Sequence, residues 1–406
     1  MNLNKSTGAL LALAIAAAIG GTALPAAPAF AAKPEAAATK LYPAATRAEP
    51  AAKSMAVTQG NAKKINEIIK IYADPTKSAE VMSLTDSVLN DPKSNAFDKA
   101  YAAQIAGVVA TNAKNFAKAI SYYQTALSSN ALSNDNHYAA MFNLAVAQSN
   151  ANDHAGAAAT ARKFLTETNS KDPNALYILG ASLYEQGQYS EAATQVKAAI
   201  DSTTTPNENW KQLYMLAMSK SGNLGGALAE AKKLADANPT NKVAQTNYIA
   251  LLQQNKQDAE ALAVMNRMRA ANLLTTDADY RNLFLAMAPV EGAEQQVIDI
   301  INEGLNKKIL TADYNVYAAL AQSYYFLGQE GKAIENFEKA GPLSTKGTTY
   351  LNLARLYWNQ GRNVDAKAAA AKAEAKGGLS DADMKTLKEI KALPDKGGKT
   401  VIIKKK

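Results

Sequence analysis

Apolar residues recur at helical spacing from Asn61 nearly to Leu393. They fall three and four positions apart, which is typical of helices that bury one face. No stretch of useful length shows the strict alternation of apolar and polar residues that indicates a strand. Glycines such as Gly187, Gly328 and Gly361 interrupt the pattern. We therefore expect an all-α chain built from short helices joined by tight turns.

The helical pattern contains an internal repeat. Segments that begin at Pro173, Tyr314 and Gly347 carry the same residue types in the same order. Large apolar residues would form one buried stripe per helix, whereas small residues would let paired helices approach closely. The aligned columns are Leu176, Tyr317 and Tyr350; Leu179, Leu320 and Leu353; Gly180, Ala321 and Ala354; Leu183, Tyr324 and Tyr357; Gly187, Gly328 and Gly361; and Ala192, Ala333 and Ala366.

These columns resemble the tetratricopeptide repeat, in which each copy of roughly 34 residues forms one helix-turn-helix. Weaker copies, marked for example by Tyr123 and Phe164, extend the resemblance over residues 61–393. It implies a right-handed α-solenoid of about nine antiparallel helix pairs. A capping helix is expected to begin at Ser380, whose hydroxyl would cap the amides around Asp383.

The N-terminal region has a different pattern. Lys5 precedes an uncharged stretch from Gly8 to Leu24, and the small residues Ala29-Phe30-Ala31 follow. This order is typical of a secretory signal peptide, so residues 1–31 are predicted to be removed between Ala31 and Ala32. An uncleaved membrane anchor is the alternative. Residues 32–60 are rich in alanine, proline and lysine, and we expect them to form a disordered tether.

The C-terminal residues 394–406 are predicted to form a basic, flexible tail. The apolar triplet Val401-Ile402-Ile403 lies between Lys399 and the closing lysines Lys404 to Lys406. The lysines could simply keep this end soluble. Alternatively, the triplet could add a short strand to a partner's sheet edge while the lysines contact an anionic surface.

Composition narrows the classes of function. Forty-four Lys and Arg residues against 36 Asp and Glu residues give a formal net charge of +8. This excess favours anionic lipid, cell-wall polymer or an acidic protein as a partner, and not nucleic acid, because basic and aromatic residues do not interleave. The chain contains no cysteine, which excludes disulfides and a lipid thioether. We expect a periplasmic protein without a stable membrane span after processing.

Few residues are suited to catalysis. The two histidines, His137 and His154, have no metal-ligand spacing. Carboxylates such as Glu191 and Glu335 occupy separate repeats at solvent-facing positions. The sequence therefore predicts no catalytic residue, no metal site and no cofactor. An envelope hydrolase built on two carboxylates that the repeats bring together is the alternative from a different class.

The resemblance also implies a binding surface, since the first helix of each tetratricopeptide pair lines a concave face. Aromatic and amide side chains with an arginine there would anchor a peptide, although tyrosine and tryptophan could instead pack neighbouring helices. In the three best copies, the first-helix positions that line this face in the family contain no lysine. This argues against a clamp for a C-terminal carboxylate. The predicted groove residues are Asn174, Tyr177, Tyr184 and Glu185; Asn315, Gln322, Tyr325 and Phe326; and Arg355 and Trp358.

Four short phrases resemble a narrower group, the exported tetratricopeptide-repeat proteins suspected of accompanying TonB-type energy-transducing systems in Gram-negative bacteria. They are residues 207–213, 279–283, 302–305 and 375–379. The resemblance implies a periplasmic scaffold or adaptor that binds partner proteins of an envelope complex. A scaffold for cell-wall synthesis, outer-membrane assembly or polymer export is the alternative, and the oligomeric state stays open.

Overall fold

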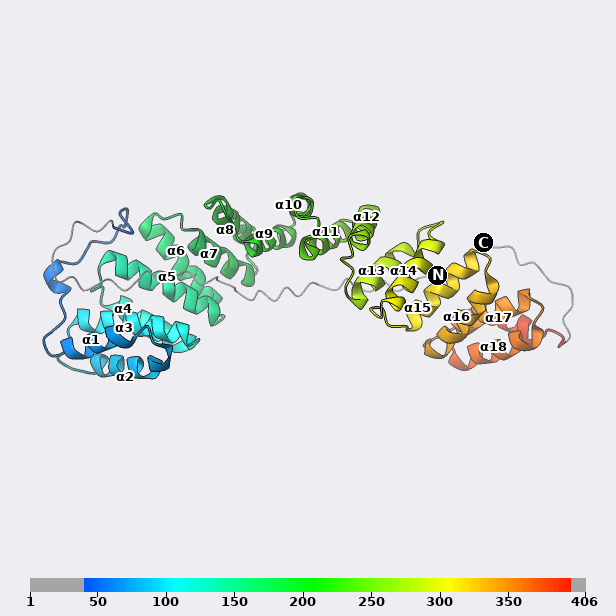
Figure 1. Ribbon diagram of the computed structural model, residues 1–406, viewed down its shortest axis with the longest axis horizontal. Helices are drawn as coiled ribbons and strands as arrows, with labels where there is room; N and C mark the ends of the chain where they lie inside the picture. Colours follow the sequence, from blue (N-terminus) through cyan, green and yellow to red (C-terminus); the bar gives the residue numbers. More distant parts are fainter. Residues whose placement is uncertain (1–39, 396–406) are drawn as a thin grey trace. The chain divides into compact units, whose positions relative to one another are not determined.

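The computed structural model describes residues 40–395 (Figure 1). The predicted signal peptide, its cleavage site at Ala31 and Ala32, residues 32–39 and the tail from residue 396 lie outside the described residues. The described residues form nineteen α-helices and two short 3-10 helices, and they contain no strand. The predicted all-α fold class is confirmed.

The chain divides into two compact units, Met1–Ala227 (unit 1) and Leu228–Lys406 (unit 2). In unit 1 the helices are α1 (Ala62–Ile71), α2 (Ser78–Leu89), α3 (Ala96–Asn112), α4 (Phe116–Ser128), α5 (Asn134–Asn150), α6 (His154–Thr168), α7 (Pro173–Glu185), α8 (Tyr189–Asp201) and α9 (Glu208–Lys220). Helix α10 (Leu224–Ala237) contains the boundary between the units. Unit 2 continues with α11 (Lys242–Gln254), α12 (Asp258–Ala270), α13 (Asp277–Met287), α14 (Glu294–Asn306), α15 (Tyr314–Phe326), α16 (Glu330–Leu343), α17 (Thr348–Asn359), α18 (Asn363–Lys376) and α19 (Asp381–Lys391).

The helices follow one another as pairs, and each turn inside a pair has a common geometry. Gly187, Gly328 and Gly361 have φ values of 76°, 73° and 70°. Glycine adopts this left-handed conformation without a steric cost. Lys114 and Asn152 take the same conformation in the turns α3–α4 and α5–α6, with φ values of 56° and 61°. The turn geometry is therefore kept in copies that have lost the glycine.

Small residues lie where paired helices touch, as the repeat columns predict. A Cβ atom built on Gly180 of α7 would lie 2.5 Å from Cγ2 of Val196 and 3.2 Å from the carbonyl oxygen of Ala192, both in α8. Ala321 and Ala333 are fully buried in one cluster between α15 and α16. The close approach of paired helices thus depends on the absence of larger side chains.

The predicted capping helix is confirmed as α19. The Ser380 hydroxyl accepts the backbone N–H of Asp383, and the Asp383 carboxylate accepts the backbone N–H of Ser380. Leu387 and Ile390 of α19 are fully buried in the cluster that α17 and α18 form. Such a helix covers an apolar face that would otherwise end the stack of repeats in water.

Residues 40–60 differ from the expected disordered tether, because part of this segment is held against α4, α5 and α6. We call residues 41–49 the strap. The Tyr42 ring makes edge contacts with Tyr138 and Phe164, at centroid distances of 5.5 and 5.6 Å. The backbone N–H of Thr46 donates to the carbonyl oxygen of Glu167 at 2.8 Å. These contacts could not be predicted from the alanine- and proline-rich composition of the segment.

Arg47 makes the densest contacts of the strap. Its guanidinium donates to the carbonyl oxygens of Asn130 and Leu132 at 2.7 and 2.8 Å, and also to the side chains of Asn130 and Asn134. Glu49 accepts the backbone N–H of Asn134 at 3.1 Å. The strap therefore satisfies polar groups at the start of α5 that helix formation leaves without partners.

Candidate functional site

The predicted binding residues lie on α7, α15 and α17, each of which is the first helix of its pair. We call the surface that the first helices form the first-helix face of each unit. In unit 1, α5 contacts both α3 and α7, and α7 also contacts α9. First helices of successive pairs are thus direct neighbours there. Residues on this side of α7 and α9 can act together as one surface.

Tyr177 of α7 does not lie open on this surface. Only 7% of its side chain is exposed, and its ring stacks on the Trp210 ring of α9 with a centroid distance of 5.2 Å and an interplanar angle of 19°. Burial raises the pKa of the Tyr177 hydroxyl. The structure therefore places Tyr177 in the packing between helix pairs, which is the alternative considered for the aromatic residues.

The other unit 1 candidates are more accessible. Asn174 is half-buried in the first turn of α7, and Glu185 is exposed at the end of the same helix. Tyr184 is half-buried and meets the Tyr189 ring edge-on at 5.2 Å. Burial raises the pKa of the Tyr184 hydroxyl, and the nearby Tyr189 and Glu185 raise it further. Three of the four predicted positions of α7 thus reach the surface.

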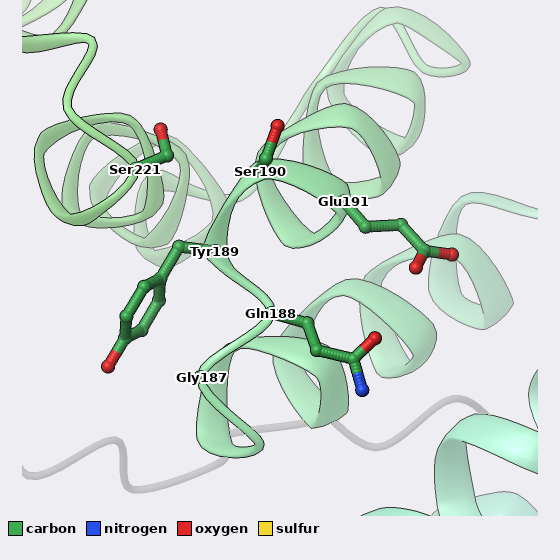
Figure 2. Close-up of a pocket in the computed structure, with 6 residues that line it drawn as sticks. All are labelled: Gly187, Gln188, Tyr189, Ser190, Glu191 and Ser221. Atoms are coloured by element: carbon green, nitrogen blue, oxygen red, sulfur yellow. The ribbon is translucent and has the colours of Figure 1, made fainter.

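A shallow hollow of about 380 Å³ lies beside these residues at the α7–α8 turn (Figure 2). It is lined by Gly187, Gln188, Tyr189, Ser190, Glu191 and Ser221. The Ser190 and Ser221 side chains point to the same side in Figure 2, and Tyr189 points away from Glu191. Glu191 is paired with Arg162 at 2.8 Å. The lining residues offer hydrogen bonds but no acid and base that converge on one point.

In unit 2, α15 carries four predicted residues. Asn315 is exposed, Gln322 is half-buried, and 49% of Phe326 is exposed. The Tyr325 ring lies 5.6 Å from the Phe326 ring and packs partly on the cluster between α15 and α18. An exposed phenylalanine one helical turn from the Gln322 amide is the type of surface that a partner can cover.

On α17, Arg355 is already engaged. Its guanidinium donates to Asp383 of α19 at 3.0 Å and to Asn352 at 3.1 Å. Burial raises the pKa of Asp383, but hydrogen bonds from Ser380 and Arg355 outweigh burial and lower it. Trp358, one turn further along α17, is half-buried against the same cluster. Arg355 therefore ties the first-helix face to the capping helix, and Trp358 is the more accessible candidate.

Two other ionisable side chains of the described residues are held by buried or charged surroundings. His137 is buried, and its pKa is lowered to about 4 by burial and by the nearby Arg47 and Lys163. Burial raises the pKa of Glu303, but hydrogen bonds from Lys307, Tyr280 and Arg269 lower it to about 2. Within residues 40–395, no three His, Asp or Glu residues gather in a way that could hold a metal ion.

Among the helices of residues 40–395, none combines the length and the apolar character needed to cross a lipid bilayer.

The helix pair α15–α16 matches a known repeat family. Residues 314–340 match the tetratricopeptide repeat. This repeat contains the four candidate residues Asn315, Gln322, Tyr325 and Phe326. No curated protein matches the chain significantly.

Several solved tetratricopeptide repeat structures are similar to this chain. One from Parabacteroides merdae shows 13% identity and a TM-score of 0.40, covering 70% of this chain and 94% of that one. The C-terminal part of another, from Cytophaga hutchinsonii, shows 12% identity and a TM-score of 0.42, covering 69% and 95%. YrrB, described as having an unusual peptide-binding site, shows 14% identity and a TM-score of 0.37, covering 45% and 89%.

Proposed function

We propose that the protein is an exported, periplasmic tetratricopeptide-repeat scaffold that binds partner proteins through its first-helix face. One observation carries the proposal. The helix α15, inside the matched repeat, presents the half-exposed Phe326 ring together with the amides of Asn315 and Gln322. Aromatic anchors surrounded by hydrogen-bonding groups supply most of the binding energy at protein interfaces.

The class of partner that we propose rests on the four short sequence phrases that resemble exported tetratricopeptide-repeat proteins. We propose an envelope complex of the TonB type, for which this chain would be an accessory during energy transduction or uptake. The signal-like residues 1–31 support export, and the formal net charge of +8 supports a partner with an acidic or anionic surface. The surface itself offers side chains for binding and no converging acid and base.

Affinity capture from cross-linked envelopes tests the binding surface. Phe326→Ala and Trp358→Ala should each weaken capture of the main partner by about tenfold or more, because truncating an interface anchor costs about 2 kcal/mol. Leu343→Ala is the matched control. It removes an exposed apolar side chain (52% exposed) from the end of α16, away from the first-helix face. Capture at wild-type strength by both anchor variants would refute the first-helix face as the binding surface.

The identity of the captured proteins tests the finer proposal. Recovery of TonB-type energisers or their receptors supports it. Recovery of proteins of cell-wall synthesis, outer-membrane assembly or polymer export would assign the same surface to the alternative pathway. N-terminal sequencing of envelope material should find Ala32 at the start, whereas an intact Lys5 on a membrane-bound form would contradict cleavage.

A further inference from the structure

Three of the seven exposed large hydrophobic residues among the described residues of unit 2 lie on one edge. We call this the turn edge, and it consists of the turns that join α13 to α14, α15 to α16, and α17 to α18. Val290 and Leu327 lie in two of these turns, and Val364 lies at the start of α18 directly after the third; the residues are 43%, 39% and 61% exposed. A row of exposed apolar side chains marks a surface that something covers.

The equivalent turns of unit 1 are polar. Gln186, Gln188 and Ser221 occupy them, and the hollow of Figure 2 lies between such residues. Leu41 is the one exposed large hydrophobic residue among the described residues of unit 1, and it lies in the strap. The repeat architecture alone therefore does not explain the apolar turn edge of unit 2.

Two turns of the edge are joined directly. The Gln360 side chain, at the end of α17, donates to the carboxylate of Glu330, the first residue of α16, at 3.1 Å. This bond joins the α17–α18 turn to the α15–α16 turn. Val364 and Leu327 thus belong to successive helix pairs, about two helix spacings of 8–10 Å apart.

The last described residue lies at this edge. The Asn363 side chain donates to the carbonyl oxygen of Pro394 at 2.7 Å, and Lys367 pairs with Asp395 at 2.7 Å. Asn363 and Lys367 flank Val364 on the first turns of α18. The chain therefore leaves the described structure beside the most exposed residue of the turn edge.

From this geometry we propose that the apolar triplet Val401-Ile402-Ile403 docks on the turn edge of its own chain. Ile402 is the seventh residue after Asp395, so an extended chain can carry it up to about 25 Å. This reach exceeds the spacing between adjacent turns. Gly397 and Gly398 permit the change of direction that docking requires.

The lysines of the tail would meet acidic residues if the tail follows the turn edge. Lys404, Lys405 and Lys406 come after the triplet, so a chain running from α18 towards α14 brings them to the far end of the edge. Glu291 and Glu294 lie there, and neither forms an ion pair among the described residues. Lysines and carboxylates would attract each other in this arrangement.

Disulfide trapping tests the docking directly, because the natural chain contains no cysteine. The double variant Leu327→Cys/Ile402→Cys places one thiol on the turn edge, away from the point where the chain leaves beside Val364, and one in the triplet. Leu343→Cys/Ile402→Cys is the matched control, since Leu343 is 52% exposed and lies at the end of α16 far from the α15–α16 turn. Both are made in the full chain after the predicted cleavage site, and far-UV circular dichroism checks that both keep their helices.

Docking predicts that the Leu327 pair forms an intramolecular disulfide at least about tenfold faster than the Leu343 pair under mild oxidation, because a bound segment has a higher effective concentration. Reversing Lys404, Lys405 and Lys406 to glutamate should slow this reaction at low salt. Equal rates for the two pairs would overturn the proposal. Disulfide-linked dimers that increase with protein concentration would also overturn it, because the triplet would then bind a second copy. No partner is present in these reactions, so the result is independent of the proposed function.

Discussion

Adding one methyl group at Gly180 should destabilise the α7–α8 pair, although alanine forms helices better than glycine. The new Cβ atom would lie 2.5 Å from Cγ2 of Val196, 3.0 Å from its backbone nitrogen and 3.2 Å from the carbonyl oxygen of Ala192. The valine side chain is stiff in a helix, and the other two atoms belong to the α8 backbone. The second helix must therefore move as a whole.

Two terms set the magnitude of this change. Overpacking costs about 1–3 kcal/mol, and replacing glycine by alanine in a helix returns up to about 1 kcal/mol. The net expectation for Gly180→Ala is a loss of about 1 kcal/mol. Gly331→Ala is the matched control, because Gly331 lies in α16 and a Cβ atom built there meets nothing within 4 Å. The same chemical change should be neutral or stabilising at Gly331.

The assay must report each pair separately, since stacked repeats do not have to unfold as one unit. Native-state hydrogen exchange of the α7 and α8 amides gives the local free energy of opening, and urea unfolding gives the global midpoint. Opening of α7 and α8 should become easier by about 1 kcal/mol in Gly180→Ala. If exchange from these helices slows, or if the two variants shift the urea midpoint equally, the packing of α7 on α8 is not limited by Gly180.

Three other predictions address separate contacts. Ala333→Leu should overpack α15 against α16 and lower the free energy of unfolding by about 1–3 kcal/mol, so unchanged thermal unfolding would contradict the aligned register. Arg47→Ala should release the strap and speed hydrogen exchange of the Thr46 amide, which donates to Glu167, by about tenfold, since hydrogen bonds from a charged group contribute about 1.5–3 kcal/mol; equal exchange in the variant and the wild type would show that the strap is held elsewhere. The pKa of Glu303 lies at about 2 in the folded chain against an ordinary value of 4.5, so its stabilisation is complete above pH 4.5 and is lost as the pH falls towards 2. Glu303→Gln should remove this part of the acid dependence in a pH titration of unfolding, and an unaltered acid profile would contradict it.

The fold could be predicted from sequence because its strongest constraint lies in aligned columns. Gly180, Ala321 and Ala333 occupy columns where a larger side chain would separate two helices, and the structure buries all three at such contacts. The turn glycines are also informative, since the left-handed conformation recurs in the turns of weaker copies. There Lys114 and Asn152 replace glycine, so sequence alone does not reveal that geometry.

The binding surface could be predicted only in part. The register placed Asn315, Gln322 and Phe326 of α15 on accessible positions. It could not show that Trp210 stacks on Tyr177, because Trp210 belongs to a copy too weak to align. The pairing of Arg355 with α19 could not be predicted either, since Asp383 was expected only to offer its backbone amide to the Ser380 cap.

The strap escaped prediction for a different reason. Its average composition is that of a disordered segment, and three residues, Tyr42, Arg47 and Glu49, determine its contacts. Their partners lie more than 80 residues further along the chain, for example at Asn130 and Asn134. Local pattern analysis does not detect pairings over such a separation.

The strap also changes how the N-terminal end of unit 1 can come apart. Stacked repeats usually fray from their ends, because an end pair has a neighbour on one side only. Here the chain is anchored to α5 and α6 before it enters α1, so the first two pairs lie inside a loop that Arg47 and its partners close. Tension on the N-terminal end would reach the contacts of the strap with the third pair first and would leave α1 to α4 unstretched until those contacts break. The mechanical resistance of this end is thus set by the contacts of the strap with α5 and α6 rather than by the packing of the first helix.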